Sequence, residues 1–86
     1  MNPLLGRIWD IWTNSPQDEL LVMLDDWRED FFQDQTFLYA IDLMEEAVYL
    51  DDYNRVYTLI REFAPVTMSG DEFNIFLDII QEAEYA

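Results

Sequence analysis

The spacing of the apolar residues is the feature that most limits how this chain can fold. These residues recur at every third and fourth position rather than at every second, which is the period of an amphipathic α-helix and not of a strand. The chain also has only two glycines and three prolines, which leaves little material for hairpin turns. The pattern therefore predicts an all-α fold, a compact bundle of about five short helices. A chain of 86 residues is too short for a second core, so residues 1–86 are expected to form a single acidic helical domain.

Helix boundaries follow from capping residues and from breaks in the apolar pattern. The clearest start is Ser15 followed by Pro16, because serine is a preferred N-cap and proline suits the first turn. Ser69 and Glu72 have the spacing of a capping box, in which the side chain of each residue bonds the backbone N–H of the other. The expected helices run from Pro3 to about Trp12, from Pro16 to about Phe32, from a break at residues 34–36 to about Leu50, from a turn at residues 51–52 to about Phe63, and onward from Ser69.

Each expected helix has one apolar stripe, and these stripes predict the core. Most of the aromatic residues lie on them and are expected to be buried. The residues expected to face inward are, helix by helix, Leu5, Ile8, Trp9 and Trp12; Leu20, Met23, Leu24, Trp27 and Phe31; Phe37, Ala40, Ile41, Met44, Ala47 and Val48; Tyr53, Val56, Tyr57 and Ile60; and Phe73, Phe76, Leu77, Ile80 and Ala83.

Acidic side chains far outnumber basic ones. There are nineteen carboxylates and four arginines, with no lysine and no histidine, which gives a net charge of −15. Twelve of the nineteen acids lie between Asp18 and Asp52, where Arg28 is the only basic residue. Half of the residues are hydrophobic, so the charge does not make the chain a disordered tail. A field of this size acts mainly on association, and it predicts a basic partner.

The acids of the second and third expected helices form the candidate partner-binding surface. Six carboxylates of the second helix fall within about 140° of arc, and the seven from Asp18 to Asp34 follow one another at about one per 4 Å. An antiparallel third helix beside them would bring the combined density close to the one charge per ~1.7 Å of a DNA duplex. Tyr39 and Tyr49 lie on the polar side of the third helix, where tyrosine can anchor an interface, stack on a partner's arginine, or pack under a neighbouring helix. The candidate residues are Asp18, Glu19, Asp25, Asp26, Glu29, Asp30, Asp34, Tyr39, Asp42, Glu45, Glu46, Tyr49, Asp51 and Asp52.

Catalytic chemistry has few candidate side chains in this chain. Histidine, cysteine and lysine do not occur, and both serines, Ser15 and Ser69, are interpreted as helix caps. No glycine-rich phosphate loop, EF-hand spacing or Glu-x-x-His pair is present in the sequence. We therefore expect no enzyme, no catalytic residue, no metal site and no cofactor.

Composition also limits the binding partners and the compartment. Phosphates require lysine and arginine, and anionic membranes attract basic segments, so direct binding to nucleic acid or to a membrane is not expected. The lack of cysteine fits a reducing compartment, and we expect no targeting or membrane-spanning segment. The cytoplasm is the expected location.

In size, acidity and helicity the chain resembles the small phage-encoded inhibitors that act as DNA mimics, among them anti-restriction and some anti-CRISPR proteins. The resemblance covers the overall character of the chain and its run of acids from Asp18 to Asp52, and it involves no sequence motif. It implies that the chain occupies a positively charged nucleic-acid site on a host enzyme or effector complex.

Other interpretations stay open. Colicin-type immunity proteins are also acidic helical bundles of about this length that bind a basic nuclease, although their paired-tyrosine-proline signature is missing here. Residues 38–63 resemble the helix-turn-helix unit of tetratricopeptide repeats, which would imply a helical protein–protein adaptor, although one unit cannot form an array. The acidic rows can also be ordinary solvated faces, and formation of a homodimer is left open.

Overall fold

The computed structural model describes residues 15–85 of the chain, and most of this part is helical. Its four helices are α2 (Pro16–Asp30), α3 (Gln35–Tyr49), α4 (Tyr53–Phe63) and α5 (Gly70–Tyr85), and no strand occurs between residues 15 and 85. The all-α bundle expected from the apolar spacing is confirmed. The helix expected from Pro3 to about Trp12, with its apolar stripe, lies outside the described residues.

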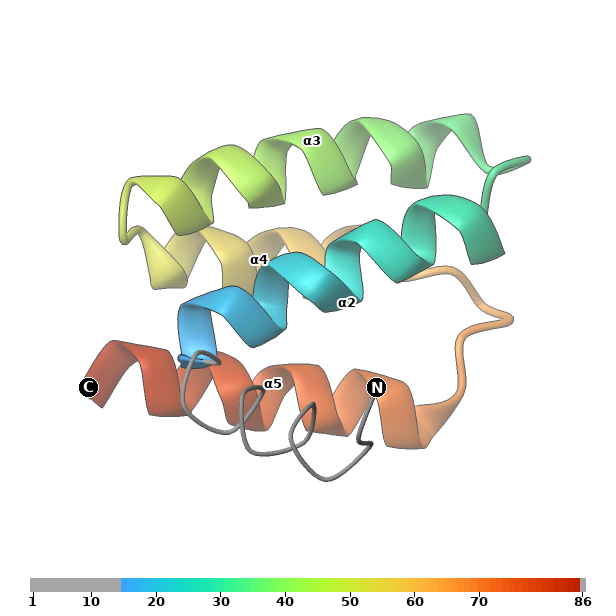
Figure 1. Ribbon diagram of the computed structural model, residues 1–86. Coiled ribbons are helices and arrows are strands. Elements are labelled where there is room, and N and C mark those ends of the chain that lie inside the picture. Colours follow the sequence, from blue (N-terminus) through green and yellow to red (C-terminus); the bar gives the residue numbers. More distant parts are fainter. Residues whose placement is uncertain (1–14, 86) are drawn as a thin grey trace, which may run out of the picture.

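The helices form a ring in which each one packs against two others. The packed pairs are α2 with α3, α3 with α4, α4 with α5, and α5 with α2. Helices that follow one another in sequence run antiparallel, and α5 returns alongside α2 to close the ring (Figure 1). The helices α2 and α4 therefore occupy opposite corners of the bundle. This arrangement decides which charged rows become neighbours.

Aromatic side chains tie three of the helices together at the centre of the bundle. The indole ring of Trp27 lies 4.7 Å from the ring of Phe76 on α5 and 5.9 Å from the ring of Phe37 on α3. Phe31 meets Phe37 edge-on, with the ring centroids 5.4 Å apart. Such tilted and edge-to-face contacts add to the stabilisation from buried apolar area. Trp27 is thus the side chain on which α2, α3 and α5 converge.

Most of the residues expected in the core are buried, and one expectation is wrong. All the inward residues predicted for α3 are buried, as are Leu20 and Leu24 of α2. Tyr57 of α4 is 40% exposed, because the helix is rotated so that Leu59 faces the core in its place. Ile79 of α5 is likewise buried without having been predicted. Met23, Phe31, Tyr53, Phe73 and Leu77 are half-buried and pack against the core.

The helix starts use the capping residues that the sequence predicts. Ser15 Oγ accepts a bond from the backbone N–H of Asp18, and Ser69 Oγ accepts one from the backbone N–H of Glu72. The capping box at Ser69 is only half formed, because the carboxylate of Glu72 accepts its bond from Trp27 Nε1 at 3.2 Å. The second helix, which was expected to run to about Phe32, ends two residues earlier, at Asp30. Residues 31–33 form a turn instead, which the bond from the backbone N–H of Asp34 to the carbonyl of Phe31 closes.

Candidate protein-binding surface

The side chains predicted to meet a partner are mostly exposed. Tyr39 and Tyr49 each keep 64% of their surface exposed, so neither packs beneath another helix of the described part. Glu19, Asp34 and Glu45 are half-buried. The remaining candidates are all exposed, namely Asp18, Asp25, Asp26, Glu29, Asp30, Asp42, Glu46, Asp51 and Asp52.

Arg28 joins the acidic rows of α2 and α3. Its Nη2 atom lies 2.7 Å from Oδ1 of Asp42 and also contacts Glu45, while its Nη1 atom lies 3.8 Å from Oδ1 of Asp25. Burial alone would lower the pKa of Arg28, but its hydrogen bonds to Asp42 and Glu45 and their charges outweigh that and raise the pKa above its ordinary value. The bridge shows that these acids of the two helices share one surface, as the sequence predicted, and that the chain partly neutralises them itself.

The other flank of α2 faces α5. Gln17 donates from Nε2 to the carbonyl of Val48 at 3.0 Å, so Gln17 and Arg28 mark the flank of α2 next to α3. At ~100° per residue, Asp26 and Asp30 lie about 160° around the helix from Arg28, toward α5, where Trp27 bonds Glu72. The exposed acids Asp71, Asp78 and Glu82 lie on α5, the helix that packs against this flank. Of these, Asp78 lines a hollow together with Asn54 and Tyr57 of α4.

Sequence reasoning did not include the α5 acids among the candidates. Their spacing already indicated one stripe, but nothing in the sequence showed that α5 packs beside α2. With them, exposed acids lie on three neighbouring helices, with α2 in the middle. More acidic residues are therefore candidates for this surface than the sequence predicted.

The arginines of α4 lie across the bundle from this surface. Arg55 and Arg61 are both exposed, on the helix at the corner opposite α2. Arg61 places its guanidinium 5.3 Å from the ring centre of Tyr57 and donates from Nη1 to the Tyr57 hydroxyl at 3.1 Å. Among the helices of residues 15–85, α4 is the one with more arginines than acids. The molecule is thus electrically polar, with its negative side centred on α2.

Three of the candidate carboxylates stabilise the helix junctions. Asp34 accepts a bond from the backbone N–H of Phe37 at 3.0 Å and thereby caps α3. Asp52 accepts from the backbone N–H of Arg55 at 3.3 Å and caps α4. Asp51 has a left-handed backbone with φ of 57° and accepts from the hydroxyl of Tyr53 at 3.0 Å. These contacts account for an acidic residue at each of the three positions without any binding partner.

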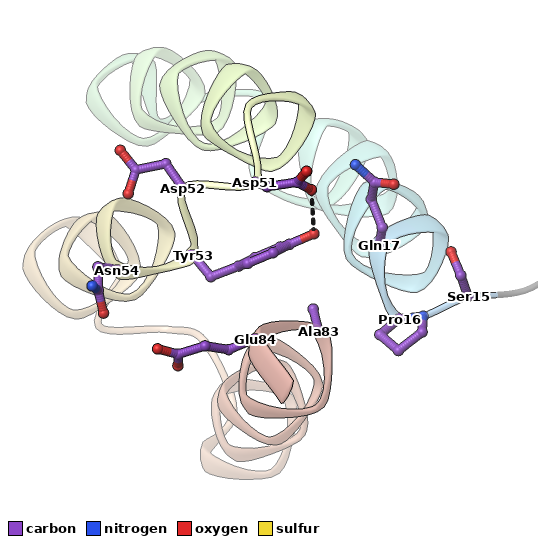
Figure 2. A pocket seen from close by; sticks show the side chains of 9 residues that line it. All are labelled: Ser15, Pro16, Gln17, Asp51, Asp52, Tyr53, Asn54, Ala83 and Glu84. Atoms are coloured by element: carbon purple, nitrogen blue, oxygen red, sulfur yellow. Dashed lines mark hydrogen bonds between the residues drawn. The ribbon is translucent and has the colours of Figure 1, made fainter. Parts of the chain in front are cut away.

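A hollow of about 500 Å³ lies at one end of the bundle, between the start of α2, the turn from α3 to α4, and the end of α5. Figure 2 shows the ring of Tyr53 lying across it, with its hydroxyl bonded to Asp51, while Asp52 and Asn54 point away. Burial and the bond to Asp51 both raise the pKa of Tyr53. Within the described residues no group of acids is placed to hold a metal ion. The acids around this hollow do not converge on one point.

Two further findings concern the chain as a whole. None of the helices between residues 15 and 85 is long and apolar enough to cross a membrane. No protein-family model, no curated protein and no solved structure matches this chain. Its function must therefore be inferred from its own surface.

Proposed function

We propose that this chain is an inhibitor that occupies the basic site of a nucleic-acid-binding protein or complex, with its carboxylates in place of phosphates. The observation that carries the proposal is the exposed acidic face of α2. The resemblance to phage-encoded anti-restriction and anti-CRISPR inhibitors points the same way and implies a role against host defence.

The spacing of the α2 acids suits this role. Six carboxylates lie between Asp18 and Asp30, a length of ~18 Å at 1.5 Å per residue, or about one charge per 3 Å. One strand of a DNA duplex carries one phosphate per ~3.4 Å of axis. The α2 row therefore has the charge density of one strand, and α3 and α5, which carry further exposed acids, pack on either side of α2.

The polarity of the molecule orients it toward such a site. Complementary fields steer association and fix the docking orientation more than they add affinity. A basic groove attracts the α2 side more strongly than the α4 side, where Arg55 and Arg61 lie. An ordinary solvated surface does not require its charges to be separated in this way.

The partner is identified first, by capture from a bacterial lysate at low and at high salt. The captured protein is then tested for competition between the chain and labelled nucleic acid. Replacing Asp25, Asp26 and Asp30 by asparagine and Glu29 by glutamine removes four of the six charges of the α2 face and keeps nearly the same shape. Because such groups act through a summed field and counterion release, each single change should cost little and the quadruple variant should compete far more weakly.

A matched comparison separates position from total charge. The pair Asp26→Asn and Glu29→Gln lies on α2, whereas the pair Glu62→Gln and Glu84→Gln lies on α4 and at the end of α5. Both pairs change the net charge equally, so only the α2 pair should weaken competition markedly. Equal effects, or a quadruple variant that folds by circular dichroism and competes like the parent, would falsify mimicry by this face.

A further inference from the structure

The exposed side of α3 carries two large aromatic side chains among its acids. Tyr39, Asp42, Glu46 and Tyr49 follow one another at spacings of three, four and three residues and so form one stripe along the helix. All of them are exposed, and the stripe is ~15 Å long at 1.5 Å per residue. We call these residues the α3 stripe. Single exposed aromatics are common, but two on one acidic stripe leave a helix face of mixed character that no helix between residues 15 and 85 covers.

This part of the molecule already binds a guanidinium group. Arg28 reaches over from α2 and bonds Asp42 through Nη2 at 2.7 Å. The shallow groove around it is also lined by Glu46, Tyr49 and Leu50, and Leu50 is 70% exposed. The carboxylate at position 42 is therefore positioned for a guanidinium, and Tyr49 borders the same groove.

An arginine of this chain stacks on a tyrosine elsewhere in the structure, on α4. On α4 the guanidinium of Arg61 lies over the ring of Tyr57, 5.3 Å from its centre, and bonds its hydroxyl. Residues 35–52 contain no arginine, and within the described part none lies over Tyr39 or Tyr49. The tyrosines of the α3 stripe thus have the exposure for such stacking, and no arginine of residues 15–85 stacks on them.

We propose that the α3 stripe docks an arginine-bearing segment of the basic partner. Guanidinium groups stack on Tyr39 and Tyr49 and bond the carboxylates of Asp42 and Glu46 between them. A carboxylate accepts several donors, so Asp42 can serve a partner's arginine while it holds Arg28. The proposal rests on the proposed function in that the partner is basic, and it narrows that partner to one that presents arginine.

Arginine rather than lysine fits the stripe for a physical reason. A guanidinium is planar and weakly hydrated, stacks on aromatic faces, and bonds carboxylates in a fixed fork. A lysine ammonium is a compact and strongly hydrated charge, which gains less from a solvent-exposed ring. A surface that acted by charge alone would not distinguish the two.

Two synthetic peptides of equal length and charge test the proposal, one with arginine and the other with lysine as its only basic residue. The full chain should bind the arginine peptide about fivefold more tightly, since stacking on two exposed rings adds a few-fold each. The preference should disappear in the double variant Tyr39→Ser/Tyr49→Ser and persist in Tyr39→Phe/Tyr49→Phe. Tyr85→Ser is the matched control, because Tyr85 is 79% exposed on α5 and away from the stripe.

Each result decides the matter. Equal affinity of the parent for the two peptides, or a preference that survives the double serine variant, overturns the docking site. So does a parent that is dimeric by light scattering and becomes monomeric in that variant, because a second copy then covers the stripe. A parent that prefers the arginine peptide without competing against nucleic acid keeps the docking site and contradicts mimicry. A parent that competes against nucleic acid but binds both peptides equally supports mimicry and overturns the docking site.

Discussion

The carboxylate of Glu72 bonds a side chain of the core rather than the backbone at the start of α5, where Glu72 lies. Its position after Ser69 suggests a side chain that bonds back to the cap, but its carboxylate accepts the indole N–H of Trp27 instead. Trp27 is only 2% exposed, so water has little access to that N–H. A buried donor without an acceptor costs more than a typical hydrogen bond contributes. The sequence could show the cap but not this bond, which joins residues far apart in the chain.

Replacement of Glu72 by alanine should lower the free energy of unfolding by about 1–3 kcal/mol, because the indole N–H of Trp27 then lacks its acceptor. Glu72→Gln keeps an acceptor oxygen and should cost much less. Asp71→Ala is the control, since it removes an acid from the same helix turn without touching Trp27. Urea melts measure all three variants. Equal losses for the alanine variants at positions 71 and 72 would show that the bond to Trp27 contributes nothing.

The elements differ in how fully their sequences specify them. For α3, caps at Asp34 and Asp52 bracket a regular apolar stripe, and both its bounds and its buried face were predictable. For α4, two apolar faces compete, and only packing against α3 and α5 decides that Leu59 is buried and Tyr57 exposed. The acidic face of α2 was likewise predictable from period alone. Its attachment to α3 through Arg28 was not, because that contact depends on how the two helices are rotated.

Replacement of Arg28 by glutamine should change stability and binding in opposite directions. It leaves Asp25, Asp42 and Glu45 without their shared cation, so the free energy of unfolding should fall by about 1 kcal/mol in urea melts at low salt. The same change exposes three uncompensated carboxylates on the α2 and α3 side, so affinity for a basic partner should rise. Arg55→Gln changes the net charge equally on the far side of the bundle. If the two variants behave alike, Arg28 acts only through total charge.

Charge separation is a property of the whole molecule that no single helix reveals. The sequence indicated where the acids are dense, but the ring order decided that α5 extends the acidic surface and that α4, with its two arginines, lies opposite. The acids of three neighbouring helices therefore repel one another in the folded state. Folding brings these charges together, and part of the stability of the core offsets that repulsion.

Added sodium chloride should therefore raise the free energy of unfolding. At 1 M salt the Debye length falls to ~3 Å, so repulsion between exposed acids is largely screened. The urea midpoint of the parent should increase with salt, and that of the quadruple α2 variant should increase less. An unchanged slope of the urea transition would show that compactness is unaffected. A midpoint that is flat or falls with salt would mean that the acids are already compensated.

The ring order of the helices also bears on how the chain reaches its fold. Three of the four helix contacts join neighbours in sequence, and only the contact of α2 with α5 joins distant parts of the described chain. Local contacts form by closing short loops, which is typical of fast-folding helical proteins. Closing α5 onto α2 involves the longest loop, and it brings Glu72 to Trp27 and places α5, with its exposed acids, beside α2. The slowest step of folding is then expected to be the one that assembles the wide acidic surface.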